Sequence, residues 1–234
     1  MQARYAALGL GLLGACADPA PASAIRDLRL TAPSGAIELV PVPAEGLAVT
    51  WTADVDGDVA LALGMVPDRV GDPTIAMATV PATVGLLTWA LPTPAPRAGT
   101  FRIHATAYGD GRPLVDASAS AIVVMQGVEF DAAALTFTGA DLDRDVDVTA
   151  TVGRPIDVEL AATPVGATAP RYLLVTASIA SDLAPIGRSF RWTGVAQDGA
   201  ALPAGAYDVT LRVAPQARPG TRYDVGGLVV TWTP

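Results

Sequence analysis

The chain has 234 residues, of which 51% are hydrophobic, 16% charged and 6% aromatic, and its formal net charge is -8. The apolar content is too high for a disordered acidic chain, and a single cysteine excludes a disulfide scaffold. A sequence pI near 4.5 argues against nucleic-acid binding, because such proteins present basic surfaces. The length fits one large domain or two domains of about 100 residues.

The N-terminus has the features of an export signal. A positive start at Met1 to Arg4 is followed by eleven apolar or small residues, Tyr5 to Ala15. As a helix this run spans about 16 Å, half of a hydrocarbon core of about 30 Å. It is therefore too short to cross a membrane and fits the apolar region of a signal peptide over residues 1–15.

The run ends in Leu13-Gly14-Ala15-Cys16, which resembles the lipobox of bacterial lipoproteins. The resemblance implies cleavage before Cys16 and covalent lipid, palmitate included, on its sulfur and its new amine. Several acyl chains, at about 0.8 kcal/mol per buried CH₂, make a lasting membrane anchor. An ordinary secretory peptide with an incidental cysteine is the alternative interpretation.

Residues 16–24 hold the candidate lipidated cysteine and a small, proline-containing stretch that we interpret as a tether. Ala17, rather than Asp, follows Cys16, and by resemblance to enterobacterial sorting this favours the outer membrane over the inner one. Whether the body faces the periplasm or the cell surface is left open. Without Cys16 the mature chain has no thiol for disulfides, metal binding or catalysis.

Beyond the tether, period-2 alternation recurs and predicts strands. Turn signals separate the strands, among them Asp56-Gly57 and Gly109-Asp110-Gly111. No long segment keeps a helical period without Gly or Pro, so we expect an all-β chain of antiparallel sandwiches. The expected inward-facing sets are Leu47, Val49, Trp51, Ala53; Val59, Leu61, Leu63, Met65; Phe101, Ile103, Ala105, Ala107; Val146, Val148, Ala150, Val152; Ile156, Val158, Leu160; and Tyr207, Val209, Leu211, Val213.

The two halves resemble each other, which predicts tandem domains over residues 25–127 and 128–234. In each half an aromatic strand containing Trp89 or Trp192 precedes a Gly-x-aromatic strand start at Phe101 or Tyr207. Upstream, Gly46 to Val49 parallels Gly153 to Ile156. Charge divides evenly, because six Arg against ten acidic residues and eight against twelve leave each half at -4.

The motifs that carry a family resemblance are short. Trp192-Thr193-Gly194, Asp198-Gly199 and Leu202 to Tyr207 look like the terminal hairpin of Ig-like modules in flagellar hook-capping proteins. The first half, from Val49-Thr50-Trp51 through Trp89 to Phe101, resembles the Ig-like domain of Ser/Thr-rich fungal cell-wall surface proteins. The resemblance implies two fibronectin-III-like or Ig-like sandwiches that act as stalks or spacers, with Val158 or a neighbour opposite Trp51.

Catalytic motifs are missing from the sequence. His104 is the only histidine, and on its predicted strand it shares the solvent face with Arg102 and Thr106. The chain has no nucleophile elbow, zinc-protease motif or phosphate-binding loop, and it contains no lysine. Its four glutamates offer no pair for glycoside hydrolysis. We therefore predict that the protein is not an enzyme.

Two aspartate clusters are the weak candidates for a metal. Asp54, Asp56 and Asp58 flank a turn, and Asp141, Asp143 and Asp145 lead into a strand. Alternating carboxylates are typical calcium ligands, but neither cluster has the Gly and Glu positions of an EF-hand loop. Solvated charges that protect strand edges explain both clusters, so we predict no cofactor, with calcium as the alternative.

The aromatic residues could instead serve a carbohydrate site. Trp51, Trp89, Trp192 and Trp232 lie in strand patterns, so we expect them in the core, whereas Tyr108, Tyr172 and Tyr223 lie nearer turns and are candidates for surface contacts. These features favour a lipid-anchored envelope protein that acts as a structural, spacer or protein-binding module. A module that binds carbohydrate or peptidoglycan is the alternative, and an exposed coplanar pair of aromatics would favour it.

Overall fold

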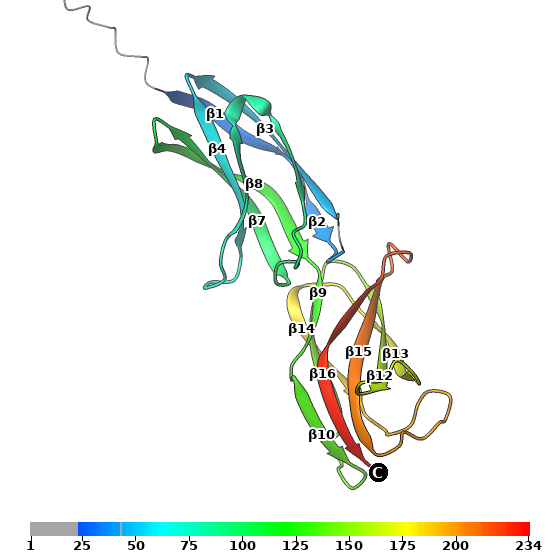
Figure 1. Ribbon diagram of the computed structural model, residues 1–234. Helices are drawn as coiled ribbons and strands as arrows, with labels where there is room; N and C mark the ends of the chain where they lie inside the picture. Colours follow the sequence, from blue (N-terminus) through cyan, green and yellow to red (C-terminus); the bar gives the residue numbers. More distant parts are fainter. Residues whose placement is uncertain (1–22, 43) are drawn as a thin grey trace, which may run out of the picture.

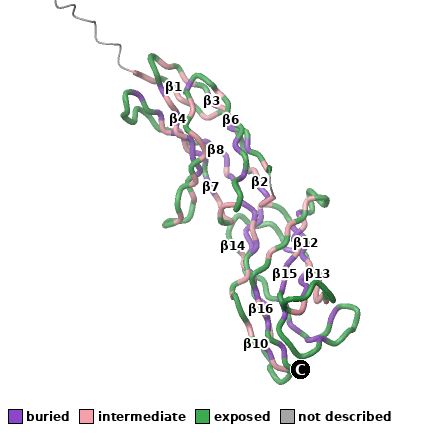
Figure 2. Tube along the Cα trace, viewed as in Figure 1, coloured by how far each residue is buried: buried purple, intermediate pink, exposed green. Residues whose placement is uncertain are grey.

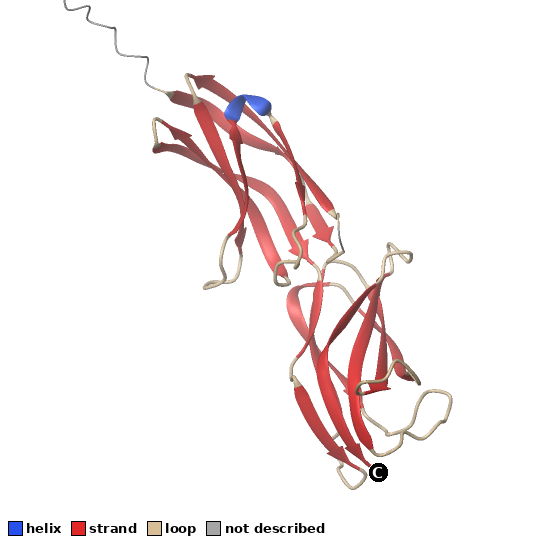
Figure 3. Cartoon of the chain, viewed as in Figure 1, coloured by secondary structure: helices blue, strands red, loops and turns tan. Residues whose placement is uncertain are grey.

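The computed structural model describes residues 23–42 and 44–234, so the predicted signal peptide, Cys16, most of the tether and Pro43 lie outside the described residues. The chain is almost entirely strands, with one short 3₁₀ turn, η1 (Figure 3). The elements are β1 (Ala24–Ala32), β2 (Ala36–Leu39), β3 (Gly46–Asp56), β4 (Val59–Pro67), β5 (Ile75–Pro81), η1 (Ala82–Val84), β6 (Leu86–Ala90), β7 (Gly99–Gly109), β8 (Arg112–Met125), β9 (Gly127–Phe130), β10 (Ala134–Thr138), β11 (Asp145–Val152), β12 (Ile156–Pro164), β13 (Tyr172–Ile179), β14 (Asp182–Arg191), β15 (Gly205–Pro215) and β16 (Tyr223–Thr233).

These strands form two sandwiches with the same topology. In the first, sheet β1-β3-β6 packs on sheet β2-β8-β7-β4-β5; in the second, β9-β11-β14 packs on β10-β16-β15-β12-β13. Strand for strand, β1 to β8 correspond to β9 to β16. The order is that of Ig-like and fibronectin-III-like domains, which confirms the predicted fold class. Each sandwich departs from pure antiparallel pairing once, because β2 runs parallel to β8 and β10 parallel to β16.

The sandwiches follow one another along a line. β1 begins at the outer end of the first sandwich, and the C-terminus lies at the opposite end of the second (Figure 1). At the outer end of the first sandwich, the backbone N–H of Ser23 donates a hydrogen bond to Oδ2 of Asp110 at 3.1 Å. At the other end, Gly139 packs against Pro234. Among the described residues there is no helix with the length and hydropathy needed to cross a bilayer.

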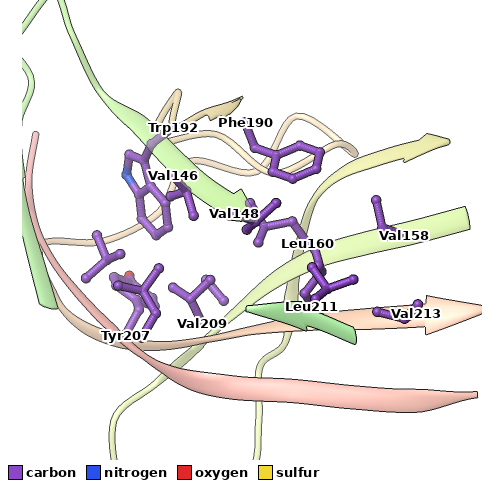
Figure 4. Packing of buried hydrophobic residues seen from close by; sticks show 14 of the residues in the cluster. Val146, Val148, Val158, Leu160, Phe190, Trp192, Tyr207, Val209, Leu211 and Val213 are labelled. Carbon is purple, nitrogen blue, oxygen red and sulfur yellow. The ribbon is translucent and has the colours of Figure 1, made fainter. Parts of the chain in front are cut away.

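Alternation along the strands builds a separate core in each sandwich. Buried positions alternate with exposed ones along most strands (Figure 2). The predicted inward-facing residues are all buried except Ala53, which is half-buried at the end of β3. In the second sandwich Trp192 and Phe190 face Tyr207, Val209 and Leu211 across the core (Figure 4). The core clusters of the two sandwiches share no residue.

The turn at Asp110-Gly111 shows how local sequence fixes the register. β7 ends at Gly109 and β8 begins at Arg112, so two residues close the hairpin. Their φ angles are 50° and 73°, as a type I′ turn requires. Aspartate and glycine tolerate this left-handed conformation, which matches the turn predicted from the sequence.

The detailed alignment of the two halves needs one correction. Gly46 to Val49 lies on β3, whose counterpart by topology is β11, whereas Gly153 to Ile156 leads into β12, the counterpart of β4. Val158 therefore does not take the place of Trp51. Both segments show the same alternation after a glycine, so a short window could not distinguish a strand of one sheet from a strand of the other.

Tyr207 stabilises the second sandwich at the start of β15. It is 2% exposed, and its hydroxyl donates to the carbonyl of Pro203 at 2.7 Å. This is the tyrosine corner known from Ig-like domains. Burial raises the pKa of Tyr207, and the nearby Tyr172 adds to the rise. The matching position in the first sandwich is Phe101, which has no hydroxyl to donate.

Replacing Tyr207 by phenylalanine should lower the free energy of unfolding of the second sandwich by about 1 to 2 kcal/mol, because the Pro203 carbonyl loses its donor. Urea denaturation measures the loss. Tyr108→Phe is the matched control, because Tyr108 is 39% exposed on the first sandwich. Equal stability of the two variants would contradict a structural role for the Tyr207 hydroxyl.

Candidate functional site at the junction of the two sandwiches

The contact between the sandwiches is organised by the carboxylate of Glu38. Glu38 lies on β2, and its Oε1 accepts a hydrogen bond from the backbone N–H of Gly153 at 2.8 Å. The same oxygen accepts from Nε2 of Gln126 at 3.0 Å. Gln126, the residue between β8 and β9, is only 3% exposed. One carboxylate oxygen therefore joins the first sandwich, the connecting residue and the second sandwich.

An ion pair between the two sandwiches lies beside the Glu38 carboxylate. Nη1 of Arg218, in the loop between β15 and β16, lies 2.8 Å from both carboxylate oxygens of Glu45. The Glu45 side chain is 16% exposed and that of Arg218 is 45% exposed. Exposed ion pairs contribute little to the free energy of folding. We therefore assign this pair to the relative orientation of the two sandwiches more than to their stability. We call Glu38, Gln126, Gly153, Glu45 and Arg218 the junction.

Close packing also restricts the connection. A Cβ on Gly127 would lie 2.3 Å from the Cβ of Ala98, so only glycine fits there without a shift of the backbone. On the same side Oγ1 of Thr100 donates to the carbonyl of Leu183 at 2.8 Å and ties β7 to β14. These contacts tie the two sandwiches together beside the connecting segment.

Two buried polar atoms at the junction have no partner among the described residues. They are the Oε1 of Gln126 and the hydroxyl of Tyr223. Burial raises the pKa of Tyr223, and the negative charge of Glu38 raises it further. The hydroxyl therefore stays protonated and remains a donor. Buried polar atoms of this kind are usually satisfied by an ordered water.

A separate groove of about 730 Å³ lies between the two sandwiches and is lined by none of the junction residues. The first sandwich supplies the loop between β4 and β5, from Pro67 to Asp72, and the start of β7. The second supplies Thr151 and Leu183 to Pro185. The lining is mainly apolar, with one ion pair at its rim, where Arg102 lies 3.3 Å from Asp68. Its polar lining residues are Asp68, Arg69, Asp72, Thr100 and Thr151.

The residues of the junction were not singled out from the sequence. The signal that could have revealed them is the scarcity of glutamate, since the chain has only four. Three of them meet partners across the junction: Glu38, Glu45, and Glu129, whose Oε1 lies 4.0 Å from Arg97. Glutamate reaches one methylene further than the aspartate used elsewhere.

The two aspartate clusters have other partners. Asp56 pairs with Arg26 at 3.0 Å, while Asp54 and Asp58 are exposed. Asp145 pairs with Arg191 at 3.0 Å and Asp141 accepts from the amide of Thr138 at 2.6 Å. Within residues 23–42 and 44–234, no three His, Cys, Asp or Glu side chains are placed to hold a metal ion.

The predicted aromatic and histidine positions are mostly confirmed. All four tryptophans are buried, between 0% and 8% exposed. His104 is half-buried on β7, between Arg102 and Thr106 on the outer face. The prediction for Tyr223 was wrong, because its hydroxyl is buried, whereas Tyr172 is half-buried and packs edge-on against Tyr207 at 6.1 Å. Tyr108 is thus the one exposed aromatic residue of the described chain.

Comparison with known proteins gives structural similarity only. No protein-family model matches the sequence, and no curated protein matches it either. Fibronectin(III)-like modules of CbhA from Clostridium thermocellum are 10% identical at a TM-score of 0.28, covering 88% of this chain and 94% of theirs. A tetra-tandem repeat from the extending region of a large adhesion protein is 16% identical at a TM-score of 0.32, covering 90% of this chain and 50% of that one.

Dimeric latent PorU from Porphyromonas gingivalis is 16% identical at a TM-score of 0.31. The match covers 96% of this chain but only 22% of PorU. At such low scores we base the fold class on the strand order: the chain is a tandem of two Ig-like sandwiches.

Proposed function

We propose that the protein is a lipid-anchored, non-enzymatic spacer of the bacterial cell envelope. The observation that carries this proposal is the junction, where Glu38 bonds to both Gln126 and Gly153 and holds two sandwiches end to end. A stiff two-module body keeps its far end at a fixed distance from its near end. The near end, at Ser23, lies at the end of the predicted tether that begins at Cys16.

The direction of the body supports the same proposal. β1 starts at the outer end of the first sandwich, so an anchor on Cys16 would place the second sandwich away from the membrane. The lipobox and Ala17 favour the outer membrane as the site of attachment. The free end of the second sandwich and the edges of the sheets are then available to another envelope protein.

The carbohydrate-binding alternative has less support. Sugar platforms on a sandwich use exposed aromatic faces, and Tyr108 is the single exposed aromatic among the described residues. One tyrosine cannot form the coplanar pair that this function predicts. Binding of the body to a wall polysaccharide on a glycan array would restore the alternative.

The anchor has a direct test. Replacing Cys16 by serine should release the protein from the membrane fraction and abolish labelling with radioactive palmitate, because serine cannot form the thioether to lipid. Ser23→Ala, at the end of the predicted tether, is the control and should stay membrane-bound. Sedimentation of Cys16→Ser with membranes, together with fatty-acid labelling, would show that the lipobox prediction is wrong.

A further inference from the structure

The edge strands of the two sandwiches differ in how they are protected from pairing with other chains. β1 carries Arg26, Asp27 and Arg29, and β14 carries two arginines, an aspartate and a proline. β2 and β9 have four residues each, one of them a glutamate. Short length, charge and proline are the usual means of blocking an edge. β13 has eight residues with no charge and no proline.

The outer edge of β13 is open. Its inner edge pairs with β12 along the whole strand, from Tyr172 to Ile179. On the outer edge, within the described chain, one backbone bond is made, from the amide of Gln197 to the carbonyl of Leu173 at 2.7 Å. Beyond Leu173 no further backbone bond is made on this edge within the described chain, and the side chain of Gln197 reaches Oγ1 of Thr176 at 3.4 Å. Unpaired backbone groups of this kind are the template that an added strand needs.

We propose that β13 pairs with β13 of a second copy of this chain, antiparallel and centred on Ala177. This register places Ala177 opposite Ala177, Val175 opposite Ile179, and Thr176 opposite Ser178. From Val175 to Ile179 the odd positions face the core side of the sheet and the even positions face solvent, whereas before the β-bulge Tyr172 and Leu174 pack on the core. Apolar residues therefore lie opposite apolar residues, and the two hydroxyl-bearing residues lie opposite each other. Both are favourable cross-strand combinations.

The charges nearest to this edge permit the pairing. Asp157 and Glu159 lie on β12, next to Ser178 and Thr176. Ser178 and Gln216 donate to Asp157 and lower its pKa, so this carboxylate is charged at neutral pH. In the pair the two β12 strands are three strand spacings apart, about 14 Å. The Debye length at physiological salt is about 8 Å, so repulsion between the carboxylates is largely screened.

The corresponding strand of the first sandwich fits a second copy less well. β5 is also uncharged, but it has seven residues and ends at Pro81. The equivalent register is centred on Val80, which pairs with Leu61 as Ala177 pairs with Val158, and it sets Thr79 against Pro81. Proline has no N–H to donate, and a polar residue would face an apolar one. β5 therefore serves as the internal control.

Sedimentation equilibrium of residues 17–234, which contain every described strand, tests the association. Strand-edge contacts are small, so we expect monomer and dimer to exchange between about 10 µM and 1 mM protein, with more dimer at higher salt. The double variant Thr176→Lys/Ser178→Lys sets lysine opposite lysine twice and should lower the association constant at least about tenfold. The variant Thr79→Lys on β5 should leave the association constant unchanged.

Oxidative cross-linking tests the register of the strand pair directly. It needs neither a measured association constant nor the lysine variants. Residues 17–234 have no cysteine, so Ala177→Cys adds a single thiol. Opposed Cα atoms in an antiparallel pair are about 4.5 to 5.5 Å apart, within the range of a disulfide. Ala177→Cys should yield disulfide-linked dimers and Val80→Cys, at the equivalent position of β5, should not. A monomer at every concentration, loss of the dimer in Thr79→Lys, or equal cross-linking of both cysteine variants would overturn the proposal.

Discussion

Replacing Glu38 by alanine is expected to loosen the junction and to destabilise the chain by about 3 kcal/mol, because the change removes two hydrogen bonds to a carboxylate. The N–H of Gly153 and the amide of Gln126 lose their acceptor, and Gln126 is 3% exposed, so water cannot easily replace it. Urea denaturation measures the loss of stability, and backbone NMR relaxation measures the tumbling of each sandwich. In the variant the two sandwiches should tumble with different correlation times.

Glu159→Ala is the matched control, because Glu159 is the one glutamate that does not face the junction. It lies on the outer face of β12, and the change should alter stability by less than about 0.5 kcal/mol. Glu38→Gln keeps an oxygen acceptor without the charge and should give an intermediate loss. If Glu38→Ala and Glu159→Ala have the same small effect, the carboxylate does not hold the sandwiches together.

Replacing Trp192 by alanine should have the largest effect of any single change in the second sandwich. Trp192 is fully buried, and its ring lies 6.0 to 6.4 Å from the rings of Phe137, Tyr207 and Trp232. Removing a tryptophan from a core costs about 3 to 5 kcal/mol through lost contacts and the cavity left behind. Its Nε1 has no hydrogen-bond partner among residues 23–42 and 44–234, so the loss comes from packing rather than from a hydrogen bond.

The same variant shows whether the two cores fold independently. No residue is shared between the two core clusters, so Trp192→Ala should unfold the second sandwich while the first keeps its structure. Amide spectra recorded along a urea titration separate the two. Trp89→Ala, at 8% exposed in the first sandwich, is the reciprocal control and should reverse the order of unfolding. A single transition for all amides in both variants would mean one cooperative unit.

Much of the fold could be predicted because its signal is local. Alternation along β7, from Phe101 to Ala107, specifies which side chains face inward, and a two-residue Asp-Gly turn fixes the following hairpin. Matching Trp89 of the first half with Trp192 of the second half also aligned the later strands of the two halves correctly. The earlier strands were misaligned, because alternation alone does not say which sheet a strand joins.

The junction could not be predicted because its contacts are distant in sequence. Glu38 and Gly153 are 115 residues apart, and Glu45 and Arg218 are 173 apart. Each contact depends on how one folded sandwich meets the other, which no local pattern encodes. Tyr223 shows the same limit, because its place near a turn suggested exposure, whereas the neighbouring sandwich encloses its hydroxyl.

The most direct test of the spacer proposal is a distance measurement between the two outer ends. The body of residues 17–234 has no cysteine, so Asp58→Cys and Leu142→Cys place one spin label in the β3–β4 turn and one in the β10–β11 loop. Leu142 is 91% exposed, so its label disturbs no packing. Pulsed electron spin resonance should give one narrow distance distribution, which broadens when Glu38→Ala is added. A broad distribution in the body with Glu38 intact would contradict a stiff spacer.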